Sequence, residues 1–321
     1  MLPKLADLEA ASKIVHSIIP PTPQYTWPLL RERLGSEVWV KHENHTPLGA
    51  FKVRGGLVYF DHLAKSGQKI AGVISATRGN HGQSVAFAAK RYGIPATVVV
   101  PHGNSREKNA AMRGLGAELI EYGQDFQEAY EYTQRLAQER SLHMVPSFAP
   151  LLVAGVGTYS LELLRAVPDL DTVYVPIGLG SGICGMMAAR DGLGLKTKIV
   201  GVVSAHAPAY ALSFAQRRAV EHKANAKLAD GIDCRVPKPE ALEAIFAGVE
   251  RIVQVTDEEV GAAMRMIFEC SHNVSEGAGA AALAAALQEK TRIAGQKVAV
   301  VMSGGNVDRQ VFAATLTGDN D

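Results

Sequence analysis

The sequence has little of what marks several large classes of protein. Its 321 residues include 3 cysteines, at positions 184, 234 and 270, with no CxxC pair, which favours buried free thiols over a disulfide framework. The 33 basic and 32 acidic residues leave a formal net charge of +1, so no overall field attracts nucleic acid or an acidic membrane. No apolar run approaches the roughly 20 residues of a membrane span, and the N-terminus lacks a signal-peptide layout. We therefore expect a cytoplasmic protein without nucleic-acid or membrane partners.

What the chain does have is a regular alternation of short apolar runs and amphipathic segments. The runs are rich in Val and Ile, and helical patterns such as 81–93 and 105–116 separate them. Such runs predict parallel strands buried on both faces, hence an α/β fold of mainly parallel sheets flanked by helices. The predicted strands are 37–43, 71–76, 96–101, 117–122, 172–177, 198–204, 251–256 and 297–303. Sites in such folds gather where strands end and helices begin.

The units group into two expected domains. Residues 68–149 form a compact series of strand–helix units, which we interpret as a small domain inserted into a larger one built from 1–67 and 150–321. Only a short segment follows the last predicted strand and its loop SGGNVD, so we expect no regulatory C-terminal domain.

Four polar or glycine-rich loops follow predicted strands, and the first, KHENHTPLGAFKVRGG at 41–56, contains Lys52. A lone lysine is usually a surface residue, but here Phe51 supplies an apolar wall and Gly49, Gly55 and Gly56 surround the pair. An ammonium group held against apolar surface loses hydration, and its free amine becomes easier to reach. Lys52 is therefore a candidate for Schiff-base chemistry.

The second loop, SATRGNHGQS at 75–84, leads from a strand end into a helix. Backbone N–H groups near Gly79 and Gly82 can bind an anion at the start of that helix. The Asn80 amide is a neutral donor suited to an anionic phenolic oxygen. For His81, we favour a structural hydrogen bond in the first helical turn over a catalytic role.

The third loop, VPIGLGSGICG at 175–185, has two interpretations. Gly180, Gly182 and Gly185 match GxGxxG, which is typical of dinucleotide sites. Such a site also needs an acid at the end of the next strand to hold the ribose, and strand 198–204 ends in Ser204. We prefer a backbone cradle for a single phosphate, formed by residues 178–182 at a helix N-terminus.

In the fourth loop, VVMSGGNVD at 300–308, the strand ends in Ser303 and two glycines let the backbone pass close to a flat group. A phosphate cradle, a lysine, an amide and a strand-end hydroxyl give a partner to each polar group of pyridoxal 5'-phosphate. These groups are the phosphate, the aldehyde carbon, the phenolic oxygen and the ring nitrogen. The four loops together predict a pyridoxal-phosphate site.

The order of these loops resembles that of the threonine dehydratase and serine racemase group of pyridoxal-phosphate enzymes, which have the tryptophan-synthase-β-like fold (fold type II). The similarity covers nearly the whole chain. The matching motifs are K-x-E…P-x-G-x-F-K-x-R-G at 41–55, GNHGQ at 79–83, the glycine-rich loop at 178–182, ADG at 229–231, EGAG at 276–279 and SGGN at 303–306.

The resemblance implies a homodimeric two-domain enzyme with the cofactor between its domains. It implies that Lys52 carries the cofactor, that Asn80 contacts the phenolic oxygen and that Ser303 faces the ring nitrogen. The other implied cofactor contacts are Phe51, Gly178, Leu179, Gly180, Ser181, Gly182, Gly231 and Glu276. The implied substrate-carboxylate site is Thr77, Arg78, Gly79, Asn80 and His81.

The implied reaction is an α,β-elimination catalysed by a pyridoxal-phosphate-dependent carbon–oxygen lyase. Lys52 removes the α-proton of an L-β-hydroxy amino acid, the cofactor spreads the negative charge, and water leaves. The resulting aminoacrylate tautomerises and is hydrolysed to a 2-oxo acid and ammonia. We expect a small substrate of the threonine or serine type, with 3-phenylserine as a larger candidate. Lys52 and Arg78 are the predicted catalytic residues.

Arg78 is the main departure from the resemblance, because racemase-like relatives have a serine there that handles a proton. A guanidinium stays protonated at any working pH and is a poor proton shuttle, so racemisation is not the expected main activity. Unless Arg78 points to solvent, it should meet an anion: the substrate carboxylate, a second carboxylate or a local acid. A second carboxylate on the substrate would extend the candidates to 3-hydroxyaspartate.

Two further departures concern a metal site and the pocket wall. Metal-dependent relatives have acids where this chain has Ser204 and Tyr210, and hard divalent cations prefer several oxygen ligands, so we predict no metal there. His206 is a lone histidine, for which we favour a structural role. Ala50 replaces the usual serine before the Phe–Lys pair and removes one hydroxyl.

Several other functions stay open on the sequence alone. Within the same fold, the alternatives are a 3-hydroxyaspartate dehydratase, an amino acid racemase and a β-replacement synthase. Outside it, the glycines at 180–185 leave a nicotinamide-dependent oxidoreductase as a weaker candidate. A cofactor-carrying binding protein without turnover is a further alternative.

Overall fold

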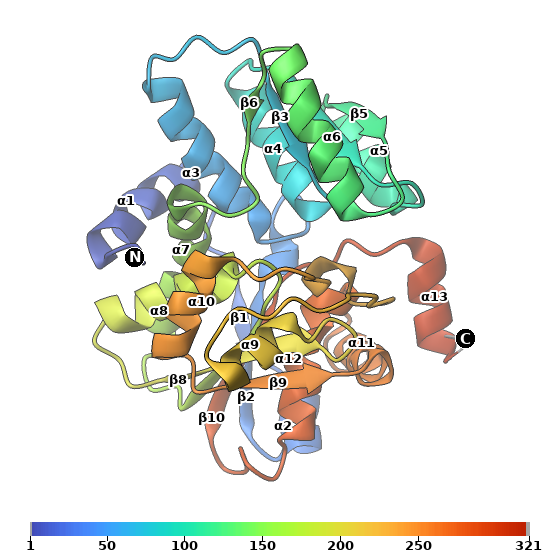
Figure 1. Ribbon diagram of the computed structural model, residues 1–321. Coiled ribbons are helices and arrows are strands. Elements are labelled where there is room, and N and C mark those ends of the chain that lie inside the picture. Colours follow the sequence, from blue (N-terminus) through green and yellow to red (C-terminus); the bar gives the residue numbers. More distant parts are fainter. Residues whose placement is uncertain (1, 319–321) are drawn as a thin grey trace.

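The computed structural model describes residues 2–318, which form two sheets flanked by helices (Figure 1). The strands are β1 Gln24–Thr26, β2 Glu37–His42, β3 Val73–Ala76, β4 Ala96–Val100, β5 Glu118–Glu121, β6 His143–Met144, β7 Thr172–Pro176, β8 Lys198–Ser204, β9 Arg251–Val255 and β10 Lys297–Met302. The helices are α1 Leu5–His16, α2 Pro28–Leu34, α3 Lys52–Lys65, α4 Asn80–Arg91, α5 Arg106–Gly114, α6 Phe126–Glu139, α7 Pro150–Ala166, α8 Ser181–Gly192, α9 Ala209–Gln216, α10 Pro239–Gly248, α11 Asp257–Ser271, α12 Gly277–Gln288 and α13 Arg309–Thr317, with short 3-10 helices η1 Glu43–His45 and η2 Asp230–Ile232.

The larger sheet has the strand order β1-β2-β10-β7-β8-β9. All its pairs are parallel except β1 with β2. The central strands β7, β8 and β10 are buried along nearly their whole length. One face packs on α7, α8 and α10, and the other on α11 and α12. Helices on both faces explain why these strands read as unbroken apolar runs.

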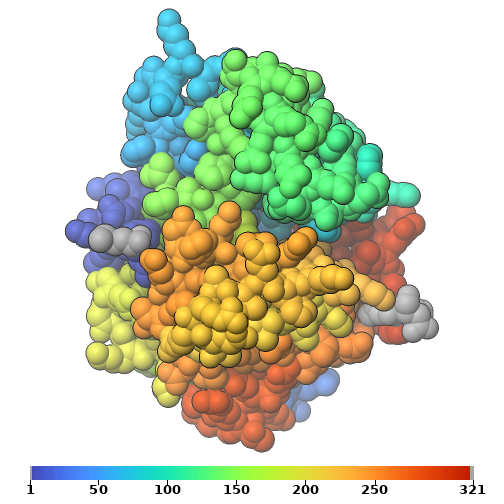
Figure 2. All heavy atoms as spheres, viewed as in Figure 1, coloured from blue at the N-terminus to red at the C-terminus, as the bar shows by residue number. Residues whose placement is uncertain are grey.

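The smaller sheet, in the order β5-β4-β3-β6, is parallel throughout. Helix α6 covers one face, while α4 and α5 cover the other. Figure 1 shows this layer above the larger sheet, and Figure 2 shows the green surface of its later residues lying against the yellow and orange surface below. The predicted α/β class, with mainly parallel sheets flanked by helices, is confirmed.

The eight strands predicted from apolar runs are all present, with ends shifted by two residues or fewer. The smaller sheet lies within 73–144, inside the range predicted for the inserted domain, and the domain boundaries at 67/68 and 149/150 stay a prediction. Two strands escaped the sequence analysis: β1 is short and exposed, and β6 has two residues. Among residues 2–318, no helix combines the length and the apolar character that crossing a membrane requires.

Helix α3, which begins at Lys52, is held close to α7 by paired glycines. A Cβ on Gly155 would lie 2.4 Å from the Arg54 carbonyl oxygen and 2.8 Å from the Cα of Gly55. Two residues further along α7, Gly157 lets this helix approach Gly185 of α8 in the same way, because a Cβ on Gly185 would lie 2.7 Å from the Cα of Gly157. These contacts fix the start of α3 against the helix that follows the glycine-rich loop.

Candidate cofactor site

The four loops singled out in the sequence come together at the carboxyl ends of β2, β3, β7 and β10, as parallel sheets require. Lys52 Nζ donates a hydrogen bond to Ser181 Oγ at 3.1 Å, which joins the first loop to the third. The backbone N–H of Phe51 donates to the Ser303 carbonyl oxygen at 3.1 Å, which joins the first loop to the fourth. Asn80 in the second loop meets Asn306 in the fourth at 2.9 Å.

The glycine-rich loop at 178–182 precedes α8, and no side chain caps that helix. Gly180 has φ +99°, a left-handed conformation that glycine adopts without a Cβ penalty. A Cβ on Gly178 would lie 2.7 Å from the Gly231 carbonyl oxygen, so the predicted site residue Gly231 packs directly against this loop. An uncapped helix N-terminus with close backbone approach is suited to bind a phosphate.

Tyr210 supports this loop, a role that the sequence analysis missed. Its hydroxyl donates to the Leu179 carbonyl oxygen at 3.0 Å and accepts from the Lys238 N–H at 3.0 Å. The side chain is almost fully buried. Tyr210 therefore ties the glycine-rich loop at 178–182 to the start of α10, at a position that the sequence analysis considered only for a metal ligand.

Lys52 has the surroundings that the sequence predicted. Its Nζ lies 4.9 Å from the centroid of the Phe51 ring, and the Ser181 hydroxyl is its hydrogen-bond partner. Burial lowers the pKa of the Lys52 ammonium to about 8, because a charged amine loses hydration without gaining a nearby carboxylate. A substantial fraction of Lys52 is therefore a neutral, nucleophilic amine near neutral pH.

Ser303 is nearly buried, and its hydroxyl has no hydrogen-bond partner among residues 2–318. Its backbone is fixed by the Phe51 N–H and by the bridge between Ala50 and Gly304. Ala50 itself is buried, and a Cβ on Gly304 would lie 3.1 Å from the Cβ of Ala50. The Ser303 hydroxyl is thus held in place with its hydrogen-bonding capacity unused.

Asn80 begins α4 and is held by two side chains. Its Nδ2 donates to Glu276 Oε1 at 2.6 Å, and its Oδ1 accepts from Asn306 Nδ2 at 2.9 Å. Asn306 Nδ2 also donates to the Leu48 carbonyl oxygen at 2.7 Å. Since Nδ2 of Asn80 carries two N–H groups, one remains for a ligand.

Glu276 is buried beside a lysine that the sequence analysis did not single out. Lys108 Nζ lies 3.2 Å from Glu276 Oε2 and 3.0 Å from Asp230 Oδ2. Burial would lower the pKa of the Lys108 ammonium, but the two carboxylates outweigh burial and raise it. The pKa of the Glu276 carboxyl is raised, because burial outweighs the opposing charge of Lys108. Lys108 belongs to α5 in the smaller-sheet layer, so its role could only emerge from long-range contacts.

The predicted substrate loop is organised by Thr77. Its Oγ1 accepts hydrogen bonds from the N–H of Gly79 at 2.9 Å and of Gly82 at 3.2 Å. His81 Nε2 is buried without a hydrogen-bond partner among the described residues, so the structure provides no structural bond for that nitrogen. Burial and the charge of Lys52 lower the pKa of His81 to about 3, which keeps the ring neutral.

Arg78 is half-buried, and its guanidinium makes no hydrogen bond or ion pair with another residue in 2–318. Its charge acts on Asp233. Burial raises the pKa of the Asp233 carboxyl, while a hydrogen bond from the Ala226 N–H and the charge of Arg78 partly oppose that rise. Arg78 thus lies on the substrate loop with all its donors available.

The positions considered for a metal have other neighbours. Ser204 Oγ accepts from the His206 N–H at 3.1 Å, and His206 is an exposed side chain whose Nε2 lies 3.8 Å from Asp257. Within residues 2–318, no group of three or more His, Cys, Asp or Glu side chains is arranged to hold a metal ion.

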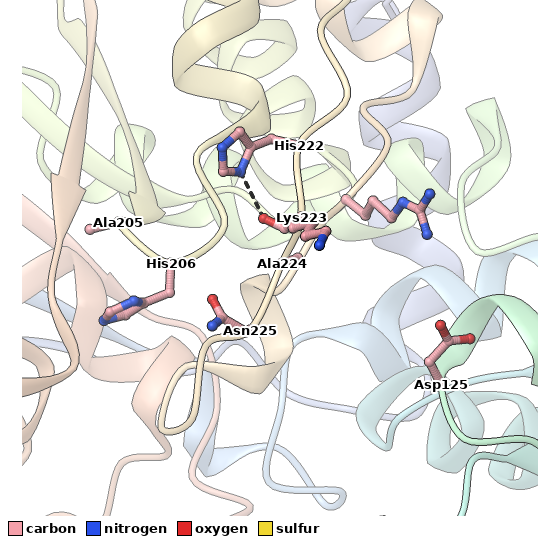
Figure 3. Close-up of a pocket in the computed structure, with 8 residues that line it drawn as sticks. Asp125, Ala205, His206, His222, Lys223, Ala224 and Asn225 are labelled. Carbon is pink, nitrogen blue, oxygen red and sulfur yellow. Dashed lines mark hydrogen bonds between the residues drawn. The ribbon is translucent and has the colours of Figure 1, made fainter.

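An open cavity of about 620 Å³ is lined by residues outside the four loops. Figure 3 shows His206 and Asp125 on opposite sides of it, with the segment 222–225 between them. None of the residues lining it is a predicted cofactor or substrate contact. Asp125 comes from the smaller-sheet layer and residues 205–206 and 222–225 follow β8 of the larger sheet, so both layers line the cavity.

Comparisons with known proteins point to the same cofactor. The family model described as "Pyridoxal-phosphate dependent enzyme" matches residues 15–304. An L-threonine ammonia-lyase of Thermotoga maritima is 36% identical over 305 residues, which is 95% of this chain and 76% of that protein. A catabolic L-threonine dehydratase of Staphylococcus aureus is 35% identical over 309 residues, covering 95% and 89%. Maize serine racemase superposes with a TM-score of 0.91 at 27% identity, covering 99% and 98%.

The chain therefore belongs to the family of pyridoxal-phosphate-dependent enzymes. It shares the fold of threonine dehydratases and serine racemase. The prediction that the chain is a pyridoxal-phosphate-dependent lyase is confirmed. The residues present fit the cofactor: an uncapped glycine loop for its phosphate, a lysine amine of lowered pKa, and an unpartnered Ser303 hydroxyl. The match with GxGxxG is accordingly better explained by a single phosphate than by a dinucleotide.

Proposed function

We propose that the enzyme is an ammonia-lyase that removes water from a small L-β-hydroxy amino acid of the threonine or serine type. The observation that carries this proposal is Lys52, whose amine lies 3.1 Å from Ser181 Oγ at the start of α8 and has a pKa of about 8. The names of the two bacterial relatives support the same reaction.

In this proposal each residue has a defined task. Lys52 would hold the cofactor, and its amine, when free, would take the α-proton of the substrate. The bound cofactor supplies an electron sink for the charge left on the α-carbon. Gly178, Leu179, Gly180, Ser181 and Gly182 bind the phosphate, Phe51 and Gly231 line the site, and Asn80 donates to the phenolic oxygen.

Ser303 and the substrate loop complete the assignment. Ser303 offers the ring nitrogen a neutral hydroxyl, which does not enforce a charged ring and favours prompt loss of the β-hydroxyl. The N–H groups and side chains of residues 77–81 bind the substrate carboxylate at the start of α4. We also propose that the enzyme is a cytoplasmic homodimer without nucleic-acid or membrane partners.

Arg78 supports a second candidate, a dehydratase for 3-hydroxyaspartate. A half-buried guanidinium without a hydrogen-bond or ion-pair partner in residues 2–318 is suited to a second carboxylate on the substrate. The same group argues against racemisation, since it cannot release a proton near neutral pH. A stacking contact with the ring of 3-phenylserine is the corresponding possibility for an apolar substrate.

The test is release of 2-oxo acid by the purified holoenzyme from L-threonine, L-serine, L-threo-3-phenylserine and L-threo-3-hydroxyaspartate. We expect turnover of threonine or serine, and none by Lys52→Ala, which should also lose the yellow colour of the bound cofactor. Preference for hydroxyaspartate that is lost in Arg78→Ser would establish the second candidate. No oxo acid from any of the four would refute elimination and favour β-replacement or a binding protein.

A further inference from the structure

Lys108 lies outside every motif of the site, yet it reaches into its centre. Helix α5 carries it from the smaller-sheet layer to Glu276, which precedes α12, and to Asp230 in η2. The Lys108 side chain is 6% exposed and Glu276 is 3% exposed. A buried lysine paired with two acids from the opposite layer needs an explanation beyond surface solvation.

The Lys108 side chain passes directly beside Gly79 of the substrate loop. A Cβ on Gly79 would lie 2.4 Å from Lys108 Cδ, so a side chain at position 79 would block the lysine. The start of α5 is fixed as well, because Asp308 accepts hydrogen bonds from the N–H groups of Arg106 and Glu107 and pairs with Ser105 Oγ. The close contact with Gly79 and the fixed start of α5 therefore both position the Lys108 side chain at Glu276.

Glu276 in turn defines how Asn80 is oriented. As an ionised carboxylate it only accepts hydrogen bonds, so it faces Nδ2 of Asn80 and not Oδ1. Asn306 supports the same orientation from the other side of the amide. The second N–H on Nδ2 is then directed to a ligand. A protonated Glu276 could donate instead, and the orientation of the Asn80 amide would then depend on the Asn306 contact alone.

We propose that Lys108 is a positioning residue: by keeping Glu276 ionised, it holds the Asn80 amide with an N–H presented to the phenolic oxygen of the cofactor. This rests on the contact between Asn80 and the phenolic oxygen that the proposed function includes. The charged groups facing Glu276 are Lys108 from α5 and Asp230 from η2, while its neighbours Asn80 and Gly304 are neutral. Cofactor affinity should therefore fall as pH drops through the titration of Glu276.

The experiment measures the dissociation constant and visible spectrum of bound pyridoxal phosphate between pH 5 and 9. In Lys108→Met the acid-side midpoint should move to higher pH by at least about one unit, since an opposite charge within ~4–6 Å shifts a carboxyl by ~1–3. Lys108→Arg should return it toward the wild-type value. Asp230→Asn should move it to lower pH, because the Asp230 charge opposes ionisation of Glu276. Glu276→Gln should remove this transition.

The outcomes separate this proposal from simpler ones. If Lys108→Met melts at lower temperature but keeps the wild-type midpoint, Lys108 only stabilises the fold and the proposal is wrong. If Lys108→Met does not fold, the opposite shift of Asp230→Asn and the loss of the transition in Glu276→Gln still decide it. If Asn80→Ala leaves affinity and spectrum unchanged, the underlying contact between Asn80 and the cofactor fails. If Asn80→Ala weakens binding while the midpoint stays constant in the other variants, only the role of Lys108 fails.

Discussion

Glu162 should be among the most important single charges for the stability of this fold. Its Oε1 lies 2.5 Å from Arg54 Nη1 and its Oε2 lies 2.6 Å from Lys41 Nζ, and both cations are fully buried. Glu43, also fully buried, is the second acid of the cluster, 2.7 Å from Arg54 Nε. The four charges cancel, and Arg54 lies two residues after Lys52 on α3, so the cluster anchors the helix that begins with the cofactor lysine.

Two arguments give the loss in the free energy of unfolding when the charge of Glu162 is removed. Glu162→Gln leaves one buried cation uncompensated, which costs about 3–5 kcal/mol when a buried ion pair is broken. Burial alone would raise the pKa of Glu162, but Arg54 and Lys41 outweigh it and lower the pKa to about 2. A fall from the ordinary 4.5 to about 2 corresponds to about 3 kcal/mol. Both estimates predict a loss of about 3 kcal/mol or more in the free energy of unfolding at pH 7.

The pH dependence follows from the sign of this change. A carboxyl with a lowered pKa in the folded state contributes stability that is complete above its unfolded pKa of about 4.3. That contribution disappears as pH falls toward about 2. The wild-type protein should therefore lose this part of its stability between about pH 4.5 and 2, and Glu162→Gln should lack that part of the acid-induced decline.

Urea unfolding followed by circular dichroism, at pH 7 and then toward acid pH, measures both effects. Glu9→Gln is the matched control, because Glu9 and Arg165 pair on the surface with about half of each side chain exposed. Such pairs contribute about 0–1 kcal/mol. A cost for Glu162→Gln no larger than that of Glu9→Gln would refute the reasoning and show that water reaches the cluster.

Three further predictions concern the site and its supports. In cofactor-free protein, the rate at which Lys52 captures pyridoxal phosphate should rise with pH around 8, because its pKa is lowered to about that value; a rise only near pH 10 in stopped-flow absorbance would contradict this. Gly155→Ala should cost about 1–3 kcal/mol by thermal unfolding, since its Cβ would meet the Arg54 carbonyl, whereas Gly114→Ala, with nothing within 4 Å of the new Cβ, should be neutral or slightly stabilising. A metal chelator should leave oxo acid release unchanged, because Ser204 and Tyr210 stand where carboxylate ligands would be required.

Most of the fold could be predicted from the sequence because buried parallel strands are locally encoded. Runs such as 172–177 and 297–303 are mainly apolar, and both became central strands of the larger sheet. By contrast, β6 is a two-residue strand that exists only because its N–H groups meet β3. Residues 143–144 have no local pattern typical of a strand, so β6 could be predicted only from its pairing with β3.

The same contrast holds within the site. Lys52, the 178–182 loop and Ser303 stand in motifs whose order along the chain is informative. Lys108 lies in SREKNAAMRGLG, where a charged residue on an amphipathic helix normally faces solvent. Its burial depends on Asp230 and Glu276, which are 122 and 168 positions away in the sequence. Ion pairs of that separation are set by the docking of two layers, and a local pattern carries no information about them.

Tyr210 stands at a position where metal-dependent relatives have an acid, and here it supports the glycine-rich loop at 178–182 instead. Its hydroxyl bridges the Leu179 carbonyl and the Lys238 N–H, so Tyr210→Phe leaves both backbone groups without this partner. Leaving a buried polar group unpaired costs about 1–3 kcal/mol. If this cost destabilises the cofactor-binding conformation of the loop at 178–182, the affinity for the cofactor falls by up to about 100-fold.

We expect a higher dissociation constant for pyridoxal phosphate in Tyr210→Phe, measured by equilibrium dialysis of the holoenzyme. Tyr92→Phe is the control, since Tyr92 follows the C-terminal end of α4 and its hydroxyl donates to Asp61, in the C-terminal half of α3, at 3.1 Å. This variant should bind the cofactor like the wild type. Equal affinity in both variants would mean that the loop holds its shape through Gly180 and the helix start alone. In that case the aromatic ring, and not the hydroxyl, would be the reason for a tyrosine at position 210.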